Sequence, residues 1–160
     1  MVREIVDERE MSGAMQRPGA KSYEEAHEQA VQNIAEELFP FPTPDYPYFL
    51  TFVNEPEPTQ KLFTNYGNEL EPDIVVLQWP EKIPVMVAEV VTPDMLTEDN
   101  ANNIWSVEAR LDNVRFFLYV PAGHAKDAKA LLKKTGIKNV SLRTWRNITG
   151  LKTIDVANLR

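Results

Sequence analysis

Two segments rich in valine and isoleucine, residues 73–79 and 85–92, constrain the fold more than any other feature of the chain. β-Branched residues favour strands, and the five intervening residues include two prolines, so the two segments predict a β-hairpin. A hairpin centred on Glu81 pairs residue 73 with 89, 75 with 87 and 77 with 85. Because side chains alternate between the two faces of a strand, this register places Asp73 and Glu89 side by side on one face. A shift of one residue would place these two acids on opposite faces.

The rest of the sequence predicts a mixed sheet flanked by helices, an α/β fold. Helices are expected at 22–38, from 97–99 to about 111, and at 124–135; further strands are expected at 48–53, 114–120 and 140–145. The run at 114–120 is almost continuously apolar, which is typical of a central strand covered on both faces. The expected order is therefore α-β-β-β-α-β-α-β.

The length of 160 residues suits one domain. Residues 1–21 are mostly polar and are expected to form a mobile N-terminal arm, which leaves 22–160 as a single domain. The chain has no cysteine, which excludes a disulfide scaffold, a thiolate zinc site and a cysteine nucleophile. Residues 1–10 are charged and do not resemble a secretory signal, and no apolar run is long enough to span a bilayer, so we expect a cytoplasmic protein.

The first helix carries a histidine on its apolar side. Ser22 and Glu25 have the spacing of a capping box, so we expect the helix to begin there. At 100° per residue, the apolar stripe comprises Tyr23, Ala26, Ala30, Val31, Ile34 and Leu38. His27 lies within this stripe, and Glu24 and Glu37 lie at its edges. A histidine in this position is more often a satisfied core residue than a ligand or a base.

The predicted hairpin brings two negative charges together. Directly opposed residues on paired strands have Cβ atoms roughly 4.5–5.5 Å apart, so the carboxylates of Asp73 and Glu89 would repel each other. Such a pair persists when it shares a proton or when a cation bridges it. Mg²⁺ prefers oxygen ligands and often takes one or two carboxylates together with water and a phosphate. The alternative is that one of the acids is a solvated residue at the end of a strand.

These acids stand in a recognisable motif context. Pro72-Asp73, Glu89–Pro93 and Asp99 fit, in order and nearly in spacing, a pattern of P-D, then E-V-x-S/T-P, then D-x-x-x-K. On these motifs the chain resembles the PD-(D/E)XK restriction-endonuclease-like superfamily, and within it a bacterial branch that is expanded in cyanobacteria. The resemblance covers roughly residues 70–121. Two departures stand out, because the lysine expected two residues after the glutamate is Val91, and the lysine expected on the following helix is Asn103.

The resemblance implies Mg²⁺- or Mn²⁺-dependent hydrolysis of a phosphodiester, with DNA as the substrate. It implies that Asp73, Glu89 and the backbone carbonyl of Val90 hold the metal, and that one more acid comes from the first helix, Glu24 or Glu37. The lysine would orient the attacking water and offset developing charge, and its absence is the main argument against an active nuclease.

Other polar side chains are candidates for the role of the missing lysine. Arg110 and Asn103 lie on one edge of the predicted helix, about two turns apart, and are candidate catalytic residues. Lys61, from a loop, is a further candidate.

The charge is unevenly distributed along the chain. Residues 122–160 contain nine Lys and Arg and two acids, whereas residues 1–121 contain eight basic and 22 acidic residues. The basic segment predicts contacts with nucleic acid through Lys126, Lys133, Arg143 and Arg146. The alternative, which we favour, is a solvated lysine-rich helix. Trp145 between Arg143 and Arg146 suggests base stacking, but we expect an inward tryptophan with both arginines outward.

Two functional alternatives stay open. A degenerate relative of the nucleases would bind nucleic acid or protein without cleaving it, which the two missing lysines favour. An interaction module would use the proline- and aromatic-rich segment 39–48, which has four prolines and could also mediate a homodimer. Packing of this segment over the core is the interpretation that its aromatic content favours.

Overall fold

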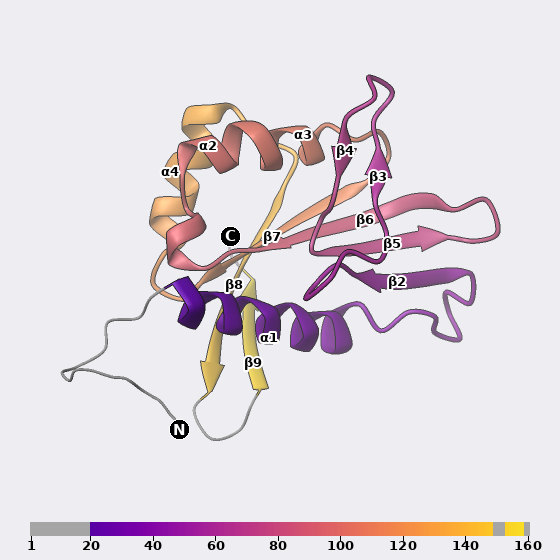
Figure 1. Cartoon of the computed structure of the whole chain (residues 1–160), viewed down its shortest axis with the longest axis horizontal. Helices are drawn as coiled ribbons and strands as arrows, with labels where there is room; N and C mark the ends of the chain where they lie inside the picture. The colour runs from indigo at the N-terminus through magenta and orange to yellow at the C-terminus, as the bar shows by residue number, and fades with distance from the viewer. Residues whose placement is uncertain (1–19, 149–152, 159–160) are drawn as a thin grey trace.

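The computed structural model describes residues 20–148 and 153–158, and it has the α+β architecture that the sequence predicts. Six strands form one mixed sheet in the order β2-β5-β6-β7-β8-β9 (Figure 1). The strands are β2 (Phe49–Val53), β5 (Ile74–Gln78), β6 (Ile83–Val90), β7 (Arg115–Pro121), β8 (Ser141–Ile148) and β9 (Thr153–Asn158). β6, β7 and β8 run parallel, and the other neighbours are antiparallel. A separate two-stranded hairpin consists of β3 (Leu62–Phe63) and β4 (Glu69–Leu70).

The helices cover the two faces of the sheet unequally. The helix α1 (Ala20–Leu38) lies on one face, and the remaining helices lie on the other (Figure 1). These are the short helix η2 (Pro93–Met95), then α2 (Glu98–Asn100), the π-helical stretch η3 (Ala101–Trp105), α3 (Ser106–Ala109), and α4 (Ala125–Thr135). Parallel neighbours need right-handed crossovers, and both crossovers advance across the sheet in one direction, so their helices share a face. None of the described helices combines the length and apolarity needed to cross a bilayer.

Two apolar clusters hold these layers together. On the α1 side, Ala30, Val31 and Ile34 are fully buried against the even-numbered side chains of β5 and β6. On the other side, the odd-numbered side chains of β5 and β6 pack with Trp105 of η3 and with α4. The sheet is therefore buried on both faces, as the nearly continuous apolar run in β7 predicts.

The hairpin register is confirmed close to the acids and wrong near the turn. Val75 pairs with Val87 as expected, and Ile74 pairs with Ala88. A bulge between Val76 and Leu77 then shifts the pairing, so Leu77 lies opposite Pro84 and not opposite residue 85. A bulge inserts one unpaired residue and changes the register only beyond itself.

Several boundaries differ from those that the sequence predicts. Ser22 does not cap the first helix, because α1 already includes Ala20 and Lys21. Of the expected N-terminal arm, residues 1–19 lie outside the described residues. β3, β4 and β9 were not predicted, because two-residue strands and a weakly apolar tail give little periodic signal. Gly136 ends α4 in the left-handed conformation, with φ of 73°.

The proline- and aromatic-rich segment packs on the chain itself. Phe39 is buried against Phe117 and Tyr119, and the ring of Phe41 contacts those of Tyr46 and Phe49. The packed interpretation of residues 39–48 therefore holds for Phe39 and in part for Phe41, whereas Tyr46 and Tyr48 are 51% and 66% exposed.

The helix that begins after Thr97 depends on a side-chain cap. Thr97 Oγ1 accepts a hydrogen bond of 3.1 Å from the Asn100 N–H. We expect Thr97→Ala to lower the free energy of unfolding by about 1 kcal/mol, because an N–H loses its partner. Thr97→Ser keeps the acceptor and serves as the matched control. Urea unfolding measures the difference, and equal stability of the two variants would contradict the capping role.

Candidate metal centre

The two predicted acids meet where β5 begins and β6 ends. Asp73 immediately precedes β5, and Glu89 is the penultimate residue of β6. Because Ile74 pairs with Ala88, Asp73 and Glu89 are adjacent across the two strands, and the charge of Asp73 helps to raise the pKa of Glu89. Asp73 is 7% exposed, and the Oε2 atom of Glu89 is buried. The spatial prediction from the hairpin pattern is therefore confirmed.

A third acid, Glu108, enters the same place from α3. Its residue surface is 1% exposed, although it is a glutamate surrounded by the core of the helical layer. Burial raises the pKa of Glu108 to about 8, since a charged carboxylate loses its hydration there, and the charge of Asp73 acts in the same direction. Burial also raises the pKa of Glu89 well above its usual value, and the nearby charges of Glu108 and Asp73 add to this.

The carboxyl groups of Glu89 and Glu108 lie within hydrogen-bonding reach of each other. Glu89 Oε2 and Glu108 Oε1 are nevertheless buried without a hydrogen-bond donor. Buried polar atoms are nearly always paired, and an unpaired one in a native fold calls for an explanation such as a bound ion. A shared proton, a buried water molecule or a bound cation would each satisfy the pair.

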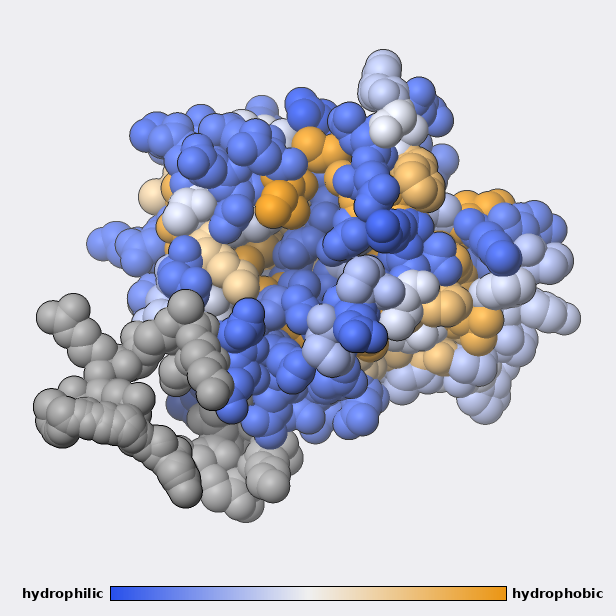
Figure 2. Space-filling view, in the orientation of Figure 1, coloured by the Kyte–Doolittle hydropathy of each residue, from blue (hydrophilic) through white to orange (hydrophobic). Residues whose placement is uncertain are grey.

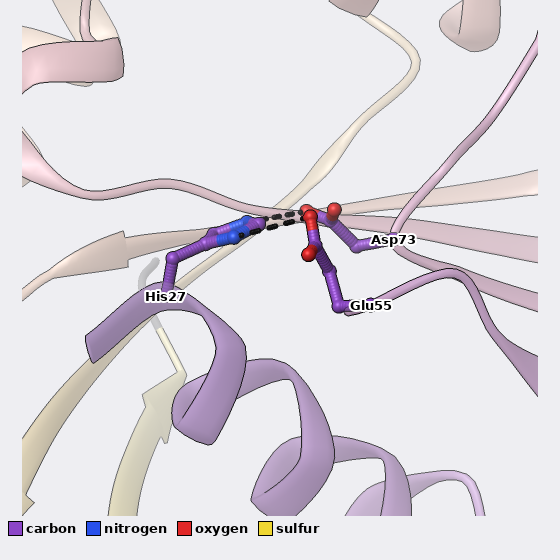
Figure 3. Close-up of side chains that lie close together, drawn as sticks. All are labelled: His27, Glu55 and Asp73. Atoms are coloured by element: carbon purple, nitrogen blue, oxygen red, sulfur yellow. Dashed lines mark hydrogen bonds and ion pairs between the residues drawn. The ribbon is translucent and has the colours of Figure 1, made fainter. Parts of the chain in front are cut away.

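On the other side of Asp73, a histidine faces two neighbouring carboxylates, those of Asp73 and Glu55 (Figure 3). His27 Nε2 lies 3.1 Å from Asp73 Oδ2, and His27 Nδ1 lies 3.4 Å from Glu55 Oε1. Burial by itself lowers the pKa of His27, but the hydrogen bond to Asp73 and the charges of Asp73 and Glu55 outweigh it, so the pKa is raised. Burial likewise raises the pKa of Glu55, against the opposing effect of His27.

This arrangement fixes the orientation of Asp73. Its Oδ2 atom accepts hydrogen bonds from His27 and, at 2.8 Å, from the Val90 N–H. None of the hydrogen bonds among the described residues uses Asp73 Oδ1, so this oxygen is available to a cation. Among the described residues, His27, Glu55 and Asp73 are the three potential ligands whose atoms lie within 4.8 Å of one another, so these three could hold a metal ion; Glu89 and Glu108 do not form such a group with Asp73.

The other residues expected in the motif lie elsewhere. Val91, at the expected lysine position, is 3% exposed in the apolar core. Asn103 is exposed, and Arg110 is exposed and lines a cavity beside the β3–β4 hairpin. Lys61 pairs with Glu69 at 2.8 Å. The group capable of positive charge that contacts Asp73 is therefore His27, and not a lysine.

The candidate acids of α1 have different neighbourhoods. Glu24 is exposed, but it is close enough for its charge to raise the pKa of Glu55. Glu37 is exposed at the far end of α1. Of the two, Glu24 is the one near the carboxylates, and His27, one turn further along, is the residue that reaches Asp73 directly.

The candidate nucleic-acid contacts do not gather in one patch. Lys126 and Lys133 are exposed on α4, which covers the sheet face opposite to α1. Arg143 is half-buried, and its guanidinium lies 5.9 Å from the ring centre of Phe117, which is on the α1 side. Arg146 is exposed, and by strand alternation it points to the opposite face from Arg143.

The expectation for Trp145 is half right. Its ring is buried as predicted, and its indole N–H donates to the Val91 carbonyl at 3.0 Å. However, Arg143 shares the face of Trp145, because residues two apart on a strand point the same way. The expectation of two outward arginines was therefore wrong for Arg143.

Sequence reasoning missed Glu55 and Glu108 for different reasons. Glu108 lies between the apolar residues Val107 and Ala109 in the helix expected to end at about residue 111, so an acid among apolar residues was a detectable signal. Glu55 lies in a loop without periodicity. Its place depends on Asn54, whose buried amide donates to the Pro72 carbonyl at 2.6 Å and accepts from the Thr59 N–H at 2.7 Å.

Comparisons with known proteins provide no relative from which to transfer a function. No family model, curated protein sequence or solved structure matches this chain. The class of the protein therefore follows from its own geometry. It is an α+β domain with a buried cluster of carboxyl groups at the junction of two central strands.

The buried carboxyls predict a characteristic dependence of stability on pH. The pKa of Glu108 is higher in the folded state than in the unfolded chain, so its contribution to stability is lost as pH rises from about 4.5 towards about 8. We expect Glu108→Gln to become more stable relative to wild type as pH increases over this interval, with a chelator present. Urea unfolding at pH 5 and pH 8 measures this, with the exposed Glu37→Gln as control. An unchanged pH dependence in Glu108→Gln would contradict the burial of an ionisable group.

Proposed function

We propose that this protein is a divalent-cation-dependent phosphodiesterase that acts on nucleic acid, and that it is a diverged relative of the PD-(D/E)XK nucleases. One observation carries the proposal: Glu89 and Glu108 lie close enough to each other and to Asp73 for their charges to interact, in a buried place where two carboxyl oxygens have no donor. The convergence of acids from the two strands of the motif with a third from the following helix supports a site built for a cation.

The donor set fits a hard divalent ion. The three carboxyl groups and the Val90 carbonyl offer oxygen only, which suits Mg²⁺ or Mn²⁺. When bound, such an ion polarises a phosphodiester and lowers the pKa of a water molecule. Its charge would also replace the protons that raised pKa values hold on Glu89 and Glu108 near neutral pH.

The residues of the chain then have separate tasks. Asp73 and Glu89 bind the ion, and the Val90 N–H and His27 orient Asp73 from behind. Glu108 completes the carboxyl set, and the proton that it holds with a pKa of about 8 is one that a bound cation would displace. His27 is a positioning residue, and as an imidazolium it supplies positive charge near Asp73 that a lysine supplies in the motif.

The missing lysine bears on the rate. A single electrostatic contributor is typically worth about 10²–10³ in rate, so we propose a slow enzyme. The second candidate is a relative that binds nucleic acid or protein without cleaving it. The burial of Val91 in the apolar core supports this candidate, because a lysine at that position would be enclosed by apolar side chains and would not reach solvent.

The metal site is tested by isothermal titration with Mn²⁺ and Mg²⁺ in two buffers of different ionisation enthalpy. We expect wild type to bind with release of protons, because the ion displaces them from Glu89 and Glu108. Binding should also stabilise the fold, by about 2.7 kcal/mol when the free ion is at 100 times its Kd. Asp73→Asn and Glu89→Gln should abolish binding, whereas Glu37→Gln should not. Absence of heat and of stabilisation in wild type would refute the site.

The activity is tested on plasmid and single-stranded DNA with Mn²⁺ or Mg²⁺. We expect slow cleavage by wild type and none by Glu89→Gln. His27→Gln should retain metal binding but lose about 10–100-fold in affinity or rate, as is typical when the partner of a ligand is removed. Metal binding without any cleavage would select the non-cleaving candidate, and cleavage that survives Glu89→Gln would exclude this site as the catalyst.

A further inference from the structure

A cavity of about 610 Å³ lies beside the β3–β4 hairpin, away from the carboxyl cluster. We call it the hairpin cavity, and its walls come from the hairpin, the end of α3 and the start of β6. Figure 2 shows apolar groups beside the hairpin in a surface that is otherwise mostly hydrophilic. The lining residues that matter here are Phe63, Tyr66, Asn65, Asn68, Arg110 and Asp112.

Two aromatic rings on this wall are exposed without a partner. Phe63 is 70% exposed and Tyr66 is 93% exposed. Neither ring stacks on another ring among the described residues. Covering an exposed ring with a flat apolar surface lowers the free energy, so both rings are available for stacking.

The turn that carries Tyr66 is well ordered by hydrogen bonds. Thr64 Oγ1 accepts from the Tyr66 N–H at 3.3 Å and from the Asn68 N–H at 3.0 Å. The Thr64 N–H donates to the Asn68 carbonyl at 2.9 Å, and Gly67 adopts the positive φ of 85° that this turn requires. The ring is therefore presented from a fixed backbone, which reduces the entropy lost when a ligand binds.

The charge in the cavity is balanced. Arg110 is exposed and makes no ion pair with the described residues, and Asp112 lies on the same wall. One cation beside one carboxylate suits a ligand with a single phosphate better than a polyphosphate. The amides of Asn65 and Asn68 add donors and acceptors for the edge of a planar heterocycle.

We propose that the hairpin cavity binds an unpaired nucleobase of a single-stranded nucleic acid, stacked on Tyr66 and Phe63, with Arg110 on the adjacent phosphate. A duplex cannot use this site, because its bases are already stacked and paired. A volume of about 610 Å³ is within the range of roughly 300–1,000 Å³ that small-molecule sites occupy.

The cavity is placed to hold a strand that also reaches the carboxyl cluster, and this step rests on the proposed function. Arg110 lies two residues after Glu108, on the outer side of the same helix end. Pro84 lines the cavity, and Glu89 lies five residues further along β6, which is about 17 Å at 3.3 Å per residue. A base held here thus lies a few nucleotides from a phosphate at the cluster.

The test measures fluorescence anisotropy of labelled 15-nucleotide single strands and 15-base-pair duplexes, with EDTA present throughout. Tyr66→Ala should raise the Kd for the single strand about 5–150-fold, since stacking is worth about 1–3 kcal/mol per base. Tyr66→Phe should restore most of the affinity. Tyr48→Ala, which removes another exposed tyrosine that does not line the cavity, is the matched control. Arg110→Gln should make the slope of the logarithm of Kd against the logarithm of salt concentration smaller, by the amount expected for the loss of about one phosphate contact.

Photocrosslinking locates the contact independently of affinity. A single strand that contains 4-thiothymidine should crosslink to the peptide spanning residues 62–70. Crosslinking elsewhere, equal Kd values for Tyr66→Ala and Tyr48→Ala, or a preference for the duplex would each overturn the proposal. Because EDTA is present, failure of the metal site does not affect this test, and the exposed Glu37→Gln should bind the single strand as wild type does.

Discussion

The antiparallel pairing of β5 and β6 is the constraint on which the candidate site depends. It places Asp73 beside Glu89 at the edge of an apolar core, and α3 adds Glu108. Two unit charges 4 Å apart interact by about 4 kcal/mol at an effective dielectric constant of 20, a large part of the 5–15 kcal/mol that stabilises a typical domain. The fold can hold three acids there only because protons or a cation reduce their charge, so the chemistry of the site follows from the topology of the sheet.

The same constraint explains why α1 contributes a histidine. Asp73 lies at the start of β5, between the two apolar clusters, and its Oδ2 atom faces His27 of α1. His27 joins Asp73 to Glu55 and is protonated more readily than a free imidazole, despite its burial. The hydrogen bonds from His27 and from the Val90 N–H hold the carboxylate of Asp73 in a defined orientation beside the other acids.

The parts of this arrangement that the sequence predicts are those governed by periodicity. Alternation of apolar residues was sufficient to pair Val75 with Val87, and helical periodicity was sufficient to bury His27. Glu108 was within reach of the same reasoning, because it interrupts an apolar stripe. Periodicity could not predict the bulge after Val76, because the bulge depends on local backbone geometry. It could not predict the position of Glu55 either, because that position depends on the hydrogen bonds of Asn54.

The departures from the lysine pattern are informative in the same physical terms. A lysine at position 91 would have to enter the core that Val91 occupies, where an unpaired ammonium is very costly. The chain instead has its positive charge on the opposite side of Asp73, on a residue whose charge depends on pH in the neutral range. A site of this kind would couple cation binding to protons on its own acids, because the pKa values of Glu89 and Glu108 are raised.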